Sequence, residues 1–183
     1  MLDKFLELMK DQFVYGGKKY ALNDERESTD VLFDVYGKNW LLGTMDKYTF
    51  RFKNLARERD LLKIATYCYI VWLKRGFWVM KQGITCPVID TNLTVKSENF
   101  KKFEDLVIKR YAEISGRFEE RPLNDLTLID SISTQLSVWA KDSWQEIDEQ
   151  TILTTVVRAY FIWKEKFSDR AGQDTDTNNE KTS

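Results

Sequence analysis

The sequence predicts an all-α protein, a helical bundle of six to seven helices. Apolar residues recur at steps of three and four along most of the chain, and strand patterns are nearly absent. Over residues 61–73 almost every position is apolar, as expected of a helix that other helices enclose. That run is too short to cross a bilayer, because about 10 to 14 apolar residues usually form a buried core helix. Helices packed against helices are therefore the expected architecture.

The first half of the chain contains segments with helical spacing over residues 1–14, 23–36, 45–56 and 60–75. We expect the first of these helices to end at Val14, because residues 15–20 contain two adjacent glycines and paired glycines interrupt helices. Residues 37–43 are predicted to form a connector, and Gly76 is expected to end the last of the four helices. Residues 78–96 form the longest irregular stretch, which also allows a short strand or hairpin.

The second half repeats the helical pattern over residues 97–118, 123–141 and 143–167. Ser143-x-x-Glu146 matches a capping box ahead of an apolar run, so we expect the last helix to start near Ser143. Residues 168–183 are polar, carry no apolar anchor and predict a disordered C-terminal tail. Together the helices would form a single domain over residues 1–167.

Two segments of the chain are similar in sequence. Tyr69-Ile-Val-Trp72 in the first half resembles Tyr160-Phe-Ile-Trp163 in the second. A tandem duplication of a helical hairpin would produce this similarity and would divide the domain into two related halves, 1–80 and 97–167. Two unrelated core helices that end in Trp and Lys would produce it as well, so the sequence leaves both explanations open.

Composition limits the chemistry available to this chain. Its 28 basic and 29 acidic residues give a net charge of −1, so a site for a polyanion would have to be a local patch. Histidine is absent, which excludes Ser-His-Asp and Cys-His catalysis and the imidazole ligands of most zinc sites. Cys68 lies in the most apolar helix and is expected to be a small buried hydrophobe. The N-terminal residues lack the pattern of a secretory signal, so we expect a cytoplasmic protein that does not enter a membrane.

A basic stretch in the first half is the best candidate for ligand binding. Lys47 and Arg51 lie one helical turn apart, and two cations at that spacing can hold a phosphate. Asp46 and Asn54 lie on the same predicted helix, and Trp40 in the preceding connector could stack on a base. A solvated basic face with Asp46 paired locally would give the same pattern.

Without histidine, a metal site would depend chiefly on carboxylates, which suit Mg²⁺. Glu27 and Asp30 lie on one predicted helix face, and Glu58 and Asp60 lie where one core helix gives way to the next. Acidic pairs of this kind are also common on solvated helices. Lys63 interrupts the apolar helix, so its ammonium must reach water, pair with a buried acid or meet an anionic ligand.

Three short motifs within residues 32–77 resemble those of one family, and they are Tyr36-Gly-Lys-Asn-Trp40, Asp46-Lys47 followed by Arg51, and Asp60-Leu-Leu-x-Ile-Ala65. The family is that of the MazG-like all-α NTP pyrophosphohydrolases, with the nucleotide-modification-associated helical domains often found in phages. The resemblance implies an all-α protein that binds nucleotides and uses Mg²⁺. That family holds Mg²⁺ with an E-x-x-E helix followed by an E-x-x-D helix, which this chain lacks between Asp46 and Tyr67. Lys63 and Thr66 stand where the family carries an acid and an amide, so the sequence leaves hydrolysis open.

Three functions are compatible with these observations. The first is a nucleotide- or phosphate-ligand-binding helical protein that resembles the MazG-like enzymes. The second is a non-enzymatic helical adaptor, such as a small subunit of a nucleoprotein or viral host-interaction assembly. Such an adaptor would bind a nucleic-acid backbone through Lys47, Arg51, Lys53, Arg57 and Arg59. The third is a homodimer, or a complex with another protein, formed through exposed Trp and Phe side chains.

Overall fold

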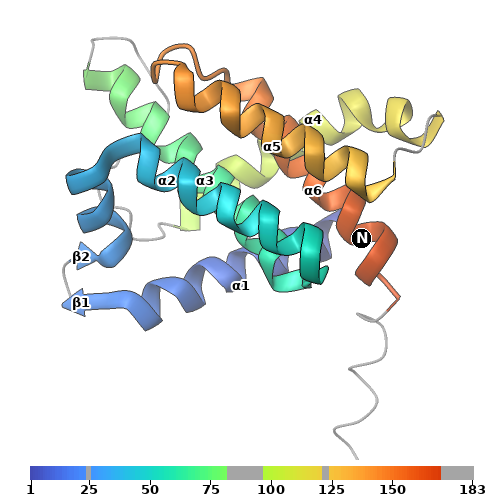
Figure 1. Cartoon of the computed structure of the whole chain (residues 1–183), viewed down its shortest axis with the longest axis horizontal. Coiled ribbons are helices and arrows are strands. Elements are labelled where there is room, and N and C mark those ends of the chain that lie inside the picture. The colour runs from blue at the N-terminus through green and yellow to red at the C-terminus, as the bar shows by residue number, and fades with distance from the viewer. Residues whose placement is uncertain (24–25, 82–96, 121–123, 170–183) are drawn as a thin grey trace, which may run out of the picture.

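The computed structural model describes residues 1–23, 26–81, 97–120 and 124–169. These residues form six helices and one short antiparallel ladder of two strands (Figure 1). The elements are α1 (Leu2–Tyr20), β1 (Ala21–Asn23), β2 (Arg26–Glu27), α2 (Ser28–Leu55), α3 (Glu58–Lys81), α4 (Ser97–Glu120), α5 (Asp125–Lys141) and α6 (Glu149–Phe167). The prediction of an all-α bundle of six to seven helices is confirmed. Most of the predicted tail, from residue 170 onward, lies outside the described residues.

Helices α3 and α6 lie side by side at the centre of the bundle (Figure 1). Helix α3 packs against α1, α2 and α6, whereas helix α6 packs against α3, α4 and α5. Helices α2 and α5 also pack against each other, in front of the central pair in Figure 1. Each of the two possible halves, 1–80 and 97–167, thus holds one central helix and two flanking helices. Among the described helices, none has both the length and the apolar character needed to span a bilayer.

The apolar run of α3 is enclosed, as its composition predicts. Its buried hydrophobic residues are Leu61, Leu62, Ile64, Ala65, Cys68, Tyr69, Ile70, Val71, Trp72 and Leu73. Within this run Lys63 and Tyr67 are partly exposed, and they lie one turn apart on a single side of the helix. Burying one Leu, Ile or Val side chain contributes about 1.5–3 kcal/mol, which outweighs the modest helix propensity of β-branched residues. The prediction of an enclosed core helix is confirmed.

Two reciprocal hydrogen bonds join the central helices. The indole Nε1 of Trp72 in α3 donates to Glu149 Oε2 at 2.9 Å, and Glu149 is the first residue of α6. The indole Nε1 of Trp163, near the end of α6, donates to Glu58 Oε1 at 2.7 Å, and Glu58 is the first residue of α3. Helices α3 and α6 are therefore antiparallel, and the start of each one is tied to a tryptophan of the other.

Aromatic side chains of each half also pack against the central helix of the other half. Phe5 of α1 contacts Trp163 of α6, with ring centroids 5.7 Å apart. Phe103 of α4 contacts Tyr69 and Trp72 of α3, with centroids 5.2 and 5.4 Å apart. The first helix of each half thus packs on the central helix of the other half, and the two halves share one core.

Two predicted breaks are wrong, namely those at residues 15–20 and at Gly76, and the connector predicted over residues 37–43 is reduced to a kink at Gly37. Helix α1 continues to Tyr20, α2 spans the predicted connector, and α3 continues to Lys81. A glycine inside a helix costs only about 1 kcal/mol relative to alanine, and the burial of a neighbour such as Leu41 offsets that cost. Gly37 separates two helical segments of α2 at a kink, and its φ of 64° and ψ of −154° lie in a region essentially restricted to glycine.

The boundaries on either side of the predicted breaks also differ in detail. The helix predicted over 23–36 starts at Ser28, because the preceding residues form the ladder of β1 and β2. The irregular stretch predicted over 78–96 begins later, since residues 78–81 are still helical. The strand or hairpin predicted in this stretch would fall on residues 82–96, which lie outside the described residues.

The last helix begins later than the capping-box pattern predicts. The Ser143 N–H does donate to Glu146 Oε2, at 2.6 Å, but the two residues close a single turn. Helix α6 starts at Glu149, and its N-cap is Asp148, whose carboxylate accepts a hydrogen bond from the Thr151 N–H at 3.2 Å. Aspartate is as good a cap as serine, so Ser143 and Asp148 are competing helix starts, and the helix begins after Asp148.

The turn between α2 and α3 leads to a first prediction about stability. Ala56 has a φ of 44°, and its N–H donates to Phe52 O at 2.8 Å, as in helix ends closed by a left-handed residue. A side chain with a Cβ pays roughly 1–2 kcal/mol for this conformation, whereas glycine does not. We therefore expect Ala56→Gly to raise the free energy of unfolding by about 1 kcal/mol in urea denaturation.

The matched control for this prediction is Ala112→Gly, at an exposed position inside α4. There the same replacement removes helix propensity without relieving strain, so stability should fall by about 1 kcal/mol. Equal losses of stability in both variants would contradict the strain assigned to Ala56.

Candidate functional site

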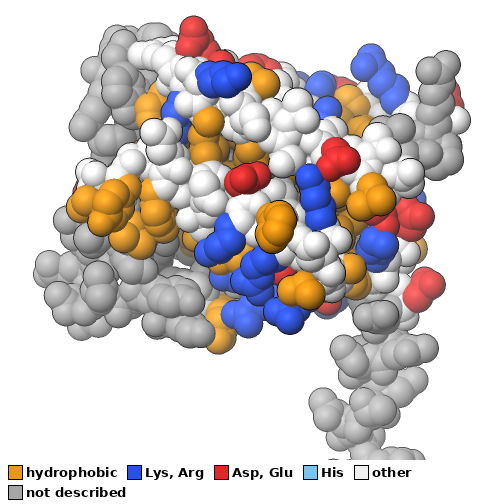
Figure 2. Space-filling model, viewed as in Figure 1, with side chains coloured by type: hydrophobic (Ala, Val, Ile, Leu, Met, Phe, Trp, Pro, Cys, Tyr) orange, Lys and Arg blue, Asp and Glu red, His pale blue; other side chains and the backbone are white. Residues whose placement is uncertain are grey.

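Basic side chains gather on one face of the molecule, over the C-terminal half of α2 (Figure 2). Of the described residues there, three cations surround the ring of Tyr48. Lys47 Nζ lies 4.6 Å from the ring centroid, Lys63 Nζ 5.0 Å and Arg51 Cζ 5.8 Å. Lys47 and Arg51 come from α2, whereas Lys63 comes from the partly exposed side of α3. We refer to these four residues as the Tyr48 cluster.

The burial of Tyr48 explains why the cluster forms at this place. Its side chain is only 7 % exposed and fills the contact between α2 and α3. Its hydroxyl oxygen accepts a hydrogen bond from Lys63 Nζ at 3.2 Å. Its ring lies 5.9 Å from that of Tyr67, which in turn lies 6.3 Å from Trp40. We refer to the rings of Tyr48, Tyr67 and Trp40 as the aromatic row. Each cation–ring contact contributes about 0.5–1 kcal/mol at an exposed site, so the ring of Tyr48 helps to hold the cations in place.

The charges of the cluster are only partly compensated. Arg51 Nη2 lies 3.4 Å from Asp60 Oδ1, and Asp60 is 2 % exposed. The other carboxylate oxygen of Asp60 is buried without a hydrogen-bond partner among the described residues. For Lys47, the described part of the chain places no carboxylate within ion-pair distance. Lys47 therefore contributes positive charge that no described carboxylate offsets, which favours an anionic ligand.

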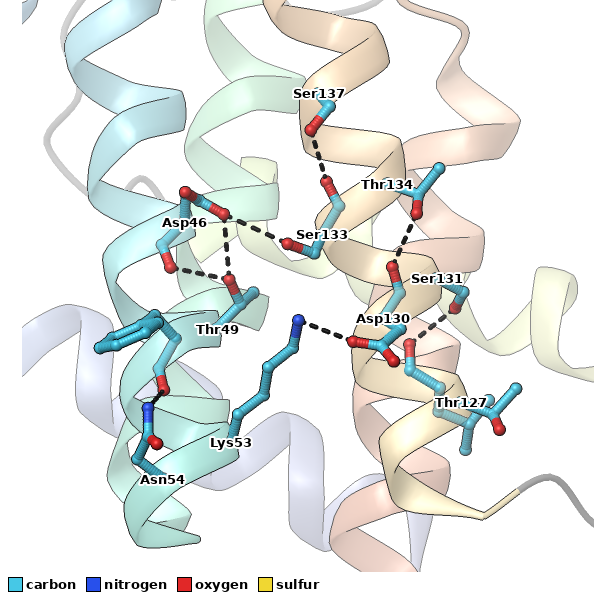
Figure 3. A network of polar contacts seen from close by, with 12 residues as sticks. Asp46, Thr49, Lys53, Asn54, Thr127, Asp130, Ser131, Ser133, Thr134 and Ser137 are labelled. Carbon is cyan, nitrogen blue, oxygen red and sulfur yellow. Dashed lines mark hydrogen bonds and ion pairs between the residues drawn. The ribbon is translucent and has the colours of Figure 1, made fainter.

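Two of the five predicted ligand-binding residues lie elsewhere. Asp46 faces α5, where its Oδ1 accepts hydrogen bonds from Thr49 Oγ1 and Ser133 Oγ, each at 3.3 Å (Figure 3). Asn54 donates its side-chain N–H to the carbonyl oxygen of Phe50 at 2.7 Å (Figure 3). The structure brings Lys47 and Arg51 together, reaches Trp40 through Tyr67, and does not bring Asp46 or Asn54 to the cluster.

The basic row expected for a nucleic-acid adaptor is also divided. Lys53 turns toward α5 and forms an ion pair with Asp130, with 2.7 Å between Nζ and Oδ1 (Figure 3). Arg59, in the first turn of α3, turns toward α1, and its Cζ is 5.4 Å from the ring centroid of Tyr15. Arg57 is exposed in the turn between α2 and α3. The cations of this segment therefore serve two different faces of the hairpin.

The four predicted magnesium ligands do not assemble into a described site. Glu58 accepts a hydrogen bond from Trp163, and Asp60 is paired with Arg51. The side chains of Glu27 and Asp30 lie outside the described part of the structure. Within that part, no three Asp, Glu, Cys or His side chains come close enough to hold a metal ion. The magnesium site stays a prediction.

Cys68 is fully buried in α3, as its position in the apolar run predicts. Burial raises the pKa of its thiol, so the reactive thiolate is disfavoured at neutral pH. The prediction that Cys68 is a small core residue is confirmed.

Sequence reasoning found two members of the Tyr48 cluster and missed its centre. Tyr48 itself was not singled out, although it stands between Lys47 and Arg51 in a helix that must bury one side. Lys63 was recognised as unusual, but its partner could only be found once α2 and α3 were folded together. Comparisons with protein-family models, curated proteins and solved structures gave no match to this chain. The resemblance to MazG-like proteins therefore stays a prediction.

Proposed function

We propose that this protein binds a phosphate-bearing ligand, such as a nucleotide, at the Tyr48 cluster. The observation that carries the proposal is the gathering of three cations around one buried tyrosine ring, where Arg51 pairs with Asp60 and Lys47 has no carboxylate within ion-pair distance among the described residues. Arginine can grip two phosphate oxygens with its planar fork, and lysine supplies a point charge. The half-buried rings of Tyr67 and Trp40 continue the cluster and suit a ligand with an aromatic base.

The proposal concerns binding and not hydrolysis. Hydrolysis of a phosphoanhydride by a MazG-like mechanism would need carboxylates that hold Mg²⁺. Glu58 and Asp60, the two predicted ligands that the structure describes, are engaged by Trp163 and Arg51 instead. Binding needs only the cations and the aromatic row, which are present.

Replacing Lys47 with glutamine tests the proposed site. Loss of one charge-assisted contact, worth about 1.5–3 kcal/mol, should weaken binding of ATP by about 10-fold or more, since 1.4 kcal/mol is a factor of ten. Isothermal titration calorimetry with ATP, and the rise in melting temperature that a ligand of the native state causes, would both report the change.

Lys53→Gln is the matched control, because it makes the same replacement on the same helix but on the face that pairs with Asp130. It should leave ATP binding unchanged. Arg51 is a poorer test residue, since its removal would leave the buried carboxylate of Asp60 without its ion pair and would lower stability. Failure of the wild-type protein to bind ATP, GTP or inorganic triphosphate, or an equal loss in both lysine variants, would refute the proposed site.

A further inference from the structure

The two halves of the bundle can be compared position by position. We call two residues counterparts when the chain separates them by as many residues as separate Trp72 from Trp163. By this rule Glu58 and Glu149 are counterparts, in agreement with their reciprocal hydrogen bonds. The rule also relates the buried positions of α2 to those of α5, and these pairs are Leu41 and Ile132, Met45 and Leu136, and Tyr48 and Trp139.

Trp139 therefore occupies in the second half the place of Tyr48 in the first. It is buried between α5 and α6, and its indole Nε1 donates to Thr151 Oγ1 at 3.3 Å. Thr151 is the counterpart of Asp60. The two aromatic side chains thus fill equivalent contacts between a flanking helix and a central helix.

The cations around Tyr48 have no basic counterparts. Lys47, Arg51 and Lys63 correspond to Val138, Asp142 and Thr154, and Arg57 and Arg59 correspond to Asp148 and Gln150. At these positions the second half carries neutral and acidic residues in place of the cations. Arg51 neutralises the buried carboxylate of Asp60, whose counterpart Thr151 carries no charge. The described part of the structure gives Lys47 no such role, and a phosphate ligand would account for its charge.

The cations also extend beyond the Tyr48 cluster. Arg59 lies one helical turn before Lys63 on the same side of α3, a separation of about 6 Å along the axis. This separation is comparable to the distance between successive phosphates of a nucleic-acid strand. Arg59 also contacts the ring of Tyr15, which is 50 % exposed and comes from α1. A single nucleotide held at Lys47 and Lys63 would account for the Tyr48 cluster but not for this second, exposed cation–aromatic pair.

We propose that the ligand is a single-stranded nucleic acid, whose backbone follows the exposed side of α3 from Lys63 to Arg59. This inference rests on the proposed function, since the Tyr48 cluster holds the first phosphate. Tyr15 then offers a stacking surface to one base, which must be unpaired to reach it. Cations one turn apart, with an exposed aromatic ring beside them, are the parts from which sites for single strands are built.

Fluorescence anisotropy with a labelled oligo-dT of about 12 nucleotides, a length within the range bound by single-strand-binding modules, tests this inference. The expected result is that the oligonucleotide binds at least 10-fold more tightly than ATP. Arg59→Gln should weaken oligonucleotide binding by about 10-fold and leave ATP binding unchanged, whereas Lys47→Gln should weaken both. Loss of the Arg59 contact should also reduce the slope of log affinity against log salt concentration by about 0.7.

Two further variants separate recognition from general charge and from folding. Tyr15→Ala should weaken oligonucleotide binding by about 10-fold, as expected when one stacked base loses its platform. Arg117→Gln, at an exposed position on α4, makes the same replacement as Arg59→Gln and should change nothing. Thermal unfolding of each variant verifies that it is folded. Because Tyr15 and Arg59 are exposed, their replacement should change the melting temperature little.

The outcomes distinguish this inference from the proposed function. If ATP binds but the oligonucleotide binds no more tightly, or if Arg59→Gln has no effect, the inference is overturned and the proposed nucleotide site stands. Equally tight binding of a duplex of the same length would overturn the assignment to single strands. If neither ATP nor the oligonucleotide binds, both proposals fall.

Discussion

Replacing Trp163 with alanine is expected to lower the free energy of unfolding by about 4 kcal/mol, within the range of 3–5 kcal/mol for buried tryptophans. The side chain is 1 % exposed, and its ring packs on Phe5 of α1 at 5.7 Å and on Tyr160 at 6.5 Å. The replacement leaves a large cavity where α1 and α6 meet, and it removes the hydrogen-bond donor of Glu58. Denaturation in urea, followed by far-ultraviolet circular dichroism, measures the loss.

Substitutions of Glu58 separate the hydrogen bond from the cavity. Glu58→Gln keeps an oxygen that can accept from Trp163 and should change stability by less than about 1 kcal/mol. Glu58→Leu removes the acceptor and leaves a buried indole N–H unpaired, which costs about 1–3 kcal/mol. If Trp163→Ala cost no more than Glu58→Leu, the aromatic packing assigned to Trp163 would be refuted.

The helices of this bundle could be predicted where their pattern is local. In α4 and α5 the apolar residues keep steps of three and four throughout, and the predicted ranges differ from the observed ones by only a few residues at either end. The enclosed run of α3 was predicted because a helix that is apolar on nearly every side has no stable place at a surface. In each case the information lies within a few turns of the same helix.

Helix ends could not be predicted in the same way. The residues after Gly37 resembled a connector, yet Leu41 is fully buried in the continuing helix α2. Gly16 and Gly76 would weaken an isolated helix, but burial of neighbouring residues in the bundle offsets their cost. Whether a helix passes through a glycine depends on what its next turn packs against, and that partner is far away in the sequence.

The candidate site was predictable only to the extent that it is local. Lys47 and Arg51 lie one turn apart on a single helix, so their proximity follows from the sequence. The contact between Tyr48 and Lys63 depends on the turn at Ala56, which brings α2 onto α3. The departure of Asp46 from the site depends on α5, which supplies Ser133 from the other half of the chain.

Tyr69→Ala is expected to cost about 4 kcal/mol as well, because Tyr69 joins three helices. Its ring lies 5.3 Å from Phe13 of α1, and 5.1 and 5.2 Å from Phe100 and Phe103 of α4. The matched variant Tyr69→Phe keeps the ring and should cost less than about 1 kcal/mol. Burial raises the pKa of the Tyr69 hydroxyl, so the group is neutral at physiological pH and its removal takes away no charge.

A double-mutant cycle with Phe103→Ala separates the contact between the halves from the cavity that Tyr69→Ala leaves. The two residues lie in different halves, and an aromatic pair at this distance contributes about 0.5–1.5 kcal/mol beyond the area it buries. The double variant should therefore lose less stability than the sum of the single losses, by about that amount, in urea denaturation. Strict additivity would mean that the Tyr69–Phe103 pair adds nothing to the contact between the halves beyond the area that each ring buries.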